Sequence, residues 1–247
     1  MFVPIIHRFG TVSSTNDIAI AMARRGEPEG TVVTALAQSS GRGRRGHTWW
    51  DHPGRNVLMS MVLRPDKPVS CLGEMAFVVS LGVAEYIARE HGLEPGLKWP
   101  NDVMIGSRKI VGILVEAVPS QEGCVVAGIG LNVNQPKFPS ELAGIATSLA
   151  IESGRFYDVD SIADGIAASV LEIHRDYLKN GFEETLGLWR KYMWGVGKQA
   201  CIMTGDQEVI GIIDGVNCSG ALVLRDSSGN TIVVHAADNI NSNGGWE

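Results

Sequence analysis

Residues 41–50, Gly-Arg-Gly-Arg-Arg-Gly-His-Thr-Trp-Trp, restrict the fold more than any other part of this sequence. Three glycines within six positions disfavour a helix, because glycine loses more conformational freedom on ordering than any other residue. Three arginines disfavour burial in an apolar core. The segment therefore predicts a loop. Arg42, Arg44 and Arg45 carry planar sets of donors suited to carboxylates and phosphates, so we expect this loop to close over a small anionic molecule.

The same segment contains the Gly-x-Gly-x-x-Gly spacing of dinucleotide-binding sites. That fingerprint requires a preceding strand and a helix that opens at the third glycine. Residues 31–37 are β-branched and apolar and predict the strand. Residues 47–54 include Pro53 and Gly54 and show no helical spacing of apolar side chains, so the helix is not expected. A solvated basic loop is the simpler alternative to a ligand-binding loop.

Composition narrows the class of protein. The 247 residues carry a formal net charge of −6, and an acidic chain with one arginine cluster fits a small anion better than a nucleic-acid backbone. No apolar run is long enough to span a membrane, and no signal peptide is evident. The four cysteines contain no Cys-x-x-Cys pair, which is typical of buried, reduced thiols. A cytoplasmic protein without zinc or disulfides is therefore expected.

Apolar periodicity predicts a mixed organisation of helices and strands. Helices are expected at 18–25, 72–90, 161–178 and 182–192, and strands at 31–37 and 56–64. Three further elements, 97–105, 109–117 and 124–134, are separated by turn residues and predict an antiparallel meander. Short strands at 200–203, 209–213, 221–225 and 231–234 predict a small β-barrel. We place a domain boundary before this predicted barrel, which gives one domain of residues 1–194 and a second of residues 195–247.

Polar residues also occur where an apolar core strand would not have them. Ser14, Thr15 and Asn16 precede a helix, where backbone N–H groups are free, although a plain N-cap is the simpler interpretation. Pro100 removes a ladder donor, so Asn101 and Asp102 are expected at an interruption between apolar segments.

Two apolar strands carry the remaining polar candidates. Lys109 begins an apolar run in which Gly112 permits close backbone approach, although a lysine at a strand end is usually solvated. Residues 128–134 alternate small, apolar and amide residues, a pattern expected of a strand that lines a cleft. No phosphate-binding Gly-x-x-x-x-Gly-Lys motif occurs.

Taken in order, these segments resemble the biotin protein ligases. The matching motifs are Ser-Ser-Thr-Asn at 13–16, Gln-x-x-Gly-Arg-Gly-Arg-Arg-Gly-x-x-Trp at 38–49, Lys-Trp-Pro-Asn-Asp-Val at 98–103, Lys-Ile-Val-Gly-Ile-Leu-Val-Glu at 109–116 and Gly-Ile-Gly-Leu-Asn-Val-Asn at 128–134. The resemblance covers residues 7–190 as a catalytic domain, and the remainder resembles the family's small SH3-like β-barrel. It implies an α+β fold with a mixed sheet, related to class II aminoacyl-tRNA synthetases and lipoate ligases.

The resemblance implies a two-step acyl transfer. The biotin carboxylate attacks the α-phosphate of ATP, which gives biotinyl-5′-AMP and pyrophosphate. A lysine of a biotin carboxyl carrier protein then attacks the mixed anhydride and releases AMP. Family members need Mg²⁺, which would act on the phosphates. Cationic side chains would neutralise the two anions that meet in the first step, and a closed loop would exclude water from the intermediate.

The resemblance also implies individual roles. The biotin-binding residues would be Ser14, Thr15, Gln38, Gly41, Arg42, Lys109 and Gly112. The nucleotide-binding residues would be Arg44, Trp49, Asn101, Lys109 and Asn132. Lys109, Arg42 and Asp102 would be catalytic, with Asp102 orienting or deprotonating the incoming lysine. No metal site built by the protein is expected.

Two departures from the family pattern are visible. Family loops usually carry Arg or Lys where this chain has His47, and a histidine is mostly neutral at pH 7, so weaker capture of the nucleotide is expected as pH rises. Bifunctional members carry a DNA-binding winged helix before the catalytic motifs. Here the first motif begins at residue 13, so a monofunctional ligase that does not bind DNA is expected.

Two other functions stay open at this stage. A non-catalytic module that binds biotin or its adenylate is one, and the retained Lys109, Asp102 and arginine loop argue against it. A lipoate or octanoate ligase of the same superfamily is the other, and the arginine loop and the 98–102 motif favour biotin. The sequence leaves both a monomer and a homodimer possible.

Overall fold

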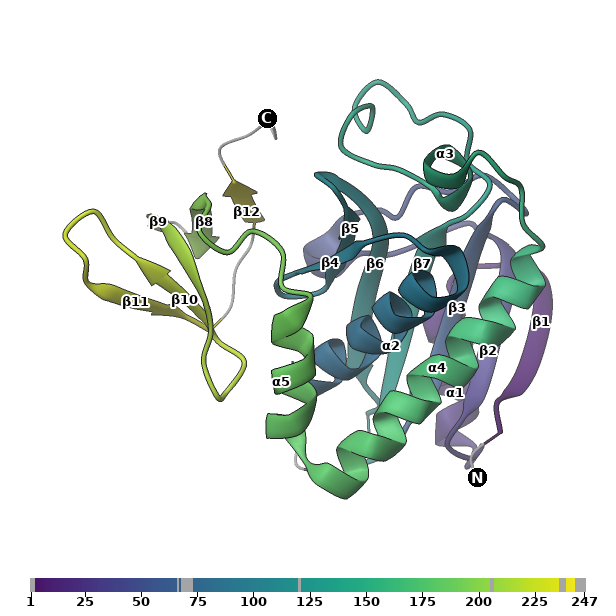
Figure 1. The fold of residues 1–247 in the computed structure, drawn as a ribbon. Coiled ribbons are helices and arrows are strands. Elements are labelled where there is room, and N and C mark those ends of the chain that lie inside the picture. The colour runs from purple at the N-terminus through teal and green to yellow at the C-terminus, as the bar shows by residue number, and fades with distance from the viewer. Residues whose placement is uncertain are drawn as a thin grey trace.

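A mixed seven-stranded sheet forms the centre of the computed structural model, which describes residues 3–65, 67, 73–119, 121–204, 207–235 and 239–242. The strands follow the order β1-β2-β3-β7-β6-β5-β4 (Figure 1). Their bounds are β1 Ile5–Val12, β2 Thr31–Gln38, β3 Asn56–Leu63, β4 Pro95–Lys98, β5 Asp102–Ile105, β6 Arg108–Ala117 and β7 Val125–Asn132. β1 pairs with β2 in parallel, and the other neighbours pair antiparallel.

Helices cover both faces of this sheet. α2 (Gly73–His91) and α4 (Val159–Asn180) pack against each other across one face, and α1 (Thr15–Arg24) packs on the other (Figure 1). The alternation of strand side chains explains this arrangement, since successive residues point to opposite faces. Val32 and Met61 belong to the larger core, whereas their neighbours Val33 and Val62 pack with Ala19 and Ala23 of α1. All eight residues of β3 are buried, as expected for a central strand covered on both sides.

A second, five-stranded antiparallel sheet follows α3 (Leu149–Ser153), α4 and α5 (Phe182–Lys191). Its order is β11-β10-β9-β8-β12, with β8 Gln199–Thr204, β9 Gln207–Val216, β10 Leu222–Arg225, β11 Thr231–Val234 and β12 Asn239–Ser242. This sheet lies beside α5 (Figure 1). The α+β organisation with a small C-terminal β unit is confirmed, and we propose 194/195 as the boundary between the two units.

Most predicted elements are confirmed, with three differences. Residues 97–105 are not one element but two strands, β4 and β5, joined by a turn at 99–101, because Pro100 has no N–H for a ladder and Asn101 bonds elsewhere. β1, α3 and β12 had no counterpart among the predicted elements. The prediction that all four cysteines are buried is wrong, since Cys218 is exposed and Cys201 is half-buried; Cys124 is buried, and Cys71 lies outside the described residues.

Hydrogen bonds tie the C-terminal sheet to the main body. Trp99 Nε1, in the turn between β4 and β5, donates to Gly220 O at 2.9 Å in a buried position. Arg190 NH2 of α5 donates to Val216 O at 2.8 Å. The turn that carries Asn101 is therefore attached directly to the second sheet.

Replacing Trp99 by phenylalanine is expected to loosen the C-terminal sheet, because the donor to Gly220 is lost and the smaller phenyl ring fills less of the buried site. A buried hydrogen bond of this kind contributes about 1 kcal/mol. Hydrogen exchange should therefore quicken in β9 and β10 relative to the main sheet. Trp189→Phe is the matched control, since Trp189 Nε1 donates to the Ser80 hydroxyl at 3.0 Å inside the main core. Equal protection of β9 and β10 in both variants would contradict the prediction.

Candidate functional site

A cavity of about 410 Å³ lies over β6 and β7 and collects most of the polar residues that the sequence singled out. Its walls come from the start of α1, the loop between β2 and β3, the β4–β5 turn and the segment 135–148. The lining residues are Ser14, Thr15, Asn16, Gln38, Arg42, Gly43, Arg44, His47, Thr48, Trp49, Leu58, Met59, Asn101, Asp102, Lys109, Gly112, Ile113, Leu114, Gly128, Ile129, Gly130, Leu142 and Ile145.

The floor of the cavity is bare main chain. Gly112 of β6 and Gly130 of β7 are register partners, and the Trp49 ring lies on them. A Cβ atom at Gly130 would come within 2.5 Å of Trp49 Cε2, and one at Gly112 within 2.7 Å of Trp49 Cζ3. Both positions therefore have to be glycine for the indole to lie there. Trp49 Nε1 is buried and has no hydrogen-bond partner among the described residues, which leaves one donor for a ligand.

The arginine loop folds back on itself as it crosses the cavity. Trp49 N donates to Gly41 O at 3.1 Å, and Arg42 and Thr48 form an isolated bridge. Residues 44–46 make one 3₁₀ turn, and no helix follows it, so the prediction of a loop without a dinucleotide-binding helix is confirmed. Gly41 is buried and does not line the cavity. It acts here as part of the closed loop.

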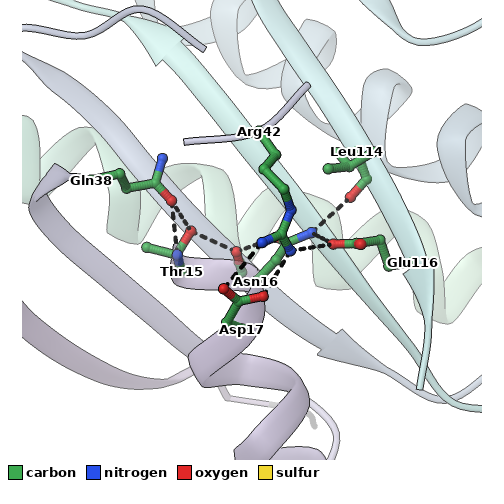
Figure 2. Close-up of polar contacts among 8 residues, drawn as sticks. Thr15, Asn16, Asp17, Gln38, Arg42, Leu114 and Glu116 are labelled. Carbon is green, nitrogen blue, oxygen red and sulfur yellow. Dashed lines mark hydrogen bonds and ion pairs between the residues drawn. The ribbon is translucent and has the colours of Figure 1, made fainter. Parts of the chain in front are cut away.

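One end of the cavity is built from small polar side chains. Thr15 N donates to Gln38 Oε1 at 2.8 Å, and the Thr15 hydroxyl lies 3.2 Å from the same oxygen (Figure 2). Ser14 holds the N-cap position of α1 with extended backbone dihedrals, but its side chain makes no capping hydrogen bond. The plain N-cap interpretation is therefore wrong for the Ser14 hydroxyl, which lines the cavity instead.

The other end is cationic. Lys109 Nζ lies 2.8 Å from Asp102 Oδ1, and the same ammonium group is 5.8 Å from the centre of the Trp49 ring. Lys98, the register partner of Asp102 on β4, is half-buried, and burial lowers the pKa of its amine. The Lys109 main chain is held by the segment 135–148, since Lys109 N donates to Ile145 O at 2.8 Å and Lys109 O accepts from Thr147 N at 2.9 Å.

Asn101 fastens the arginine loop to the sheet. Its Nδ2 donates to Ile113 O at 2.6 Å, and its Oδ1 accepts from Arg44 NH1 at 3.3 Å. Both polar ends of the Asn101 side chain are thus used inside the protein. The arrangement places the Arg44 guanidinium on the same side of the cavity as Lys109 and Asp102.

Arg42 is paired with two carboxylates. Its guanidinium donates to both oxygens of Asp17, at 3.0 and 2.7 Å, and lies 3.4 Å from Glu116 Oε2 (Figure 2). The hydrogen bond from Arg42 lowers the pKa of Asp17, and the bond to Asp17 raises that of Arg42. The sequence did not single out Asp17, and it gave Glu116 no role, although Glu116 ends one of the motifs.

Asn132 is, after Gly41, the second sequence candidate that does not line the cavity. It is buried at the end of β7, its Nδ2 donates to Thr147 O at 3.0 Å, and it does not line the cavity. Its Oδ1 has no partner among the described residues. Leu142 and Ile145, by contrast, line the cavity without having been predicted, because segment 135–148 has no periodic pattern.

The described residues contain no group of three or more His, Cys, Asp or Glu side chains that could hold a metal ion. Asp102 is the only carboxylate among the residues that line the cavity. Within the described part of the chain, no helix is long and apolar enough to cross a membrane.

Comparisons with known proteins give the family to which this fold and site belong. Residues 9–134 match the model of the biotin/lipoate A/B protein ligase family. The bifunctional ligase/repressor BirA of Bacillus subtilis is 35% identical over 222 residues, which cover 88% of this chain and 68% of that protein. The biotin–acetyl-CoA-carboxylase ligase of Mycobacterium tuberculosis is 33% identical, with 91% and 84% covered.

Solved structures agree on the fold. A biotin protein ligase from Aquifex aeolicus, solved in complex with biotin and ATP, superposes with a TM-score of 0.84 at 23% identity, covering 96% of this chain and 98% of that one. The chain belongs to the biotin/lipoate A/B protein ligase family, and within that family to the biotin protein ligases.

Proposed function

We propose that this protein attaches biotin to a lysine of a biotin carboxyl carrier protein at the expense of ATP, through biotinyl-5′-AMP. One observation carries the proposal: a single cavity joins a small polar end, with Ser14, Thr15 and Gln38, to a cationic end with Lys109 and Arg44. The first end suits a neutral head group with hydrogen-bonding edges, and the second suits a carboxylate and a phosphate. Named relatives support the assignment, since two of them are biotin–acetyl-CoA-carboxylase ligases.

In the first step a carboxylate oxygen of biotin attacks the α-phosphorus of ATP and pyrophosphate leaves. The two reactants are anions, so a fixed cation between them lowers the barrier. Lys109 fits this role because its ammonium group lies in the cavity and its main chain is held on both sides by the segment 135–148. Arg44, held by Asn101, would add a second cation.

In the second step the carrier lysine attacks the carbonyl carbon of the mixed anhydride, and AMP leaves with the bonding electrons. The attacking amine must lose a proton, and a nearby carboxylate can accept it. Asp102 is the candidate, because among the described residues it is the only carboxylate that lines the cavity, and it lies beside Lys109. Trp49 and the closed loop would exclude water, which would otherwise hydrolyse the anhydride.

Mg²⁺ would bind in this site together with ATP. The cavity offers one carboxylate, which already pairs with Lys109, and Mg²⁺ is commonly held by substrate phosphates with only one or two protein carboxylates. The residues therefore fit Mg²⁺ as a partner of ATP. A cytoplasmic location, where ATP and the carrier are made, belongs to the same proposal.

The test is to incubate the protein with biotin, ATP and Mg²⁺, to add a biotin carboxyl carrier domain afterwards, and to analyse both pools by mass spectrometry. Biotinyl-5′-AMP in the first pool and one added biotin on the carrier in the second are expected. Lipoate in place of biotin serves as the control for the related ligases. A folded protein that binds biotin but forms neither product would contradict the proposal and favour a binding module.

His47 is exposed and lines the cavity at a position where an arginine would carry a permanent positive charge. The His47→Arg variant is therefore expected to bind biotinyl-5′-AMP more tightly than the unaltered protein. Calorimetric titration of both proteins under the same conditions checks it, and equal affinities would refute it.

A further inference from the structure

Behind the polar end of the cavity, a chain of buried side chains connects Glu116 with Thr15. Glu116 Oε2 accepts from Asn16 Nδ2 at 2.5 Å, and Asn16 Oδ1 lies 2.5 Å from Ser60 Oγ. The Ser60 hydroxyl is 2.7 Å from the Thr15 hydroxyl, which lines the cavity. Ser60 is fully buried, and Thr15 and Asn16 are each 3% exposed. Figure 2 shows that Arg42 approaches the same carboxylate from the loop.

The sheet is shaped to admit Asn16. A Cβ atom at Gly128 would come within 2.4 Å of Asn16 Oδ1, so the asparagine fits only above a glycine. The orientation of its amide is fixed by its neighbours, because Glu116 Oε2 and Leu114 O are both acceptors and only the NH₂ group can face them. Asn16 Oδ1 must therefore point at Ser60.

This orientation decides where the hydroxyl protons lie. Asn16 Oδ1 can only accept, so the single proton of Ser60 is directed to it. The Ser60 oxygen is then left as an acceptor for Thr15. The Thr15 proton goes to the shorter of its two contacts, 2.7 Å to Ser60 against 3.2 Å to Gln38 Oε1. The Thr15 oxygen consequently faces the cavity with lone pairs only.

We infer that Glu116 is a positioning residue for ligand specificity, which acts through Asn16 and Ser60 to keep Thr15 a hydrogen-bond acceptor in the cavity. A chain of hydrogen bonds that ends in a carboxylate also strengthens its first acceptor, because each bond polarises the next. The inference rests on the proposed function and deepens it, since it names the edge of the substrate that the pocket selects.

The neighbouring side chain completes the match. Gln38 Oε1 faces Thr15 and accepts from Thr15 N, which leaves the Gln38 NH₂ group, on the other side of the same amide, as a donor from this wall of the cavity (Figure 2). An acceptor beside a donor is complementary to an N–H beside a C=O, as in a cyclic urea. A dithiolane ring has neither group. The buried chain would therefore contribute to the choice of biotin over lipoate.

The test compares biotin with an analogue in which one ureido N–H is replaced by a ring oxygen, a cyclic carbamate of the same shape. Calorimetry gives the ratio of the two dissociation constants for the intact protein and for three variants. Glu116→Gln allows the side-chain amide of Asn16 to rotate by half a turn, because a glutamine can donate a hydrogen bond to the Asn16 oxygen. Ser60→Ala breaks the chain at its middle. Asp17→Asn is the matched control, since it removes a carboxylate partner of Arg42 and does not touch Asn16.

The intact protein is expected to prefer the urea. Glu116→Gln and Ser60→Ala should each reduce that preference by about tenfold, and Asp17→Asn should retain it. Thermal unfolding checks that each variant is folded. A folded Glu116→Gln or Ser60→Ala variant that prefers the urea as strongly as the intact protein does would overturn the inference. An equal loss in Asp17→Asn would also overturn it, because the effect would then come from Arg42. If the intact protein bound no biotin, the proposed function itself would fail.

Discussion

Replacing Lys109 by alanine is expected to lower the rate of biotinyl-5′-AMP formation by about two to three orders of magnitude, as loss of a fixed transition-state charge does in other enzymes. The reason is local: the ammonium group lies in the cavity, 2.8 Å from Asp102, and Lys109 and Arg44 are the cations at that end. Release of pyrophosphate in the absence of a carrier domain measures the step. Lys109→Arg should recover part of the rate, because the charge is kept and its geometry changes.

The matched control is Lys67→Ala. Lys67 has a similar exposure and also pairs with a carboxylate, that of Glu74 at 3.2 Å, and it is not among the residues that line the cavity. The Lys67→Ala variant should form the adenylate at a rate close to that of the intact protein. The role given to Lys109 is wrong if both alanine variants form adenylate equally fast, or if Lys109→Ala loses activity only because it no longer folds, as circular dichroism would show.

The second large effect is expected at Gly130. Alanine there would place a methyl group 2.5 Å from Trp49 Cε2, and an overlap of this size costs about 1–3 kcal/mol when neighbours must move. The ring lies on a loop and the sheet is rigid, so the loop should give way. We expect Gly130→Ala to raise the dissociation constant for biotin more than about tenfold, while the protein stays folded. Trypsin should cleave the arginine loop faster.

Gly10→Ala provides the comparison for Gly130→Ala. Gly10 is also a strand glycine, and a Cβ atom there would meet nothing within 4 Å. Biotin affinity and the rate of tryptic cleavage should stay unchanged in that variant. Slow cleavage of the loop in Gly130→Ala, equal to that of the intact protein, would show that Trp49 does not depend on the bare main chain beneath it.

The sequence predicted the parts of this site that local chemistry determines. The loop from Gly41 to Trp50 was predictable because glycines and arginines together exclude both a helix and an apolar core. The interruption at Pro100 was predictable from its missing N–H. Lys109 lies in the cavity as expected, although the pattern alone allowed a solvated strand end.

What the sequence did not reveal depends on contacts between distant segments. Glu116 and Asn16 are 100 positions apart, and only the packing of α1 on the sheet, against β2, β3 and β7, brings them together. The segment 135–148 is placed by main-chain bonds to Lys109, which leave no trace in side-chain pattern. β1 was missed because it is an edge strand, exposed or half-buried along its length, and shows no clear alternation.

The glycine floor has a consequence for altering what this protein accepts. Gly112 and Gly130 contribute no side chain that could be trimmed, and the Trp49 ring already lies against them, so substitutions at these two positions cannot deepen the cavity. Room for a bulkier carboxylic acid has to come from the walls, where Leu58, Leu142 and Ile145 contribute removable side-chain volume. Leu142 and Ile145 belong to an irregular segment and not to the sheet, which makes them the first positions to vary in a library for new substrates.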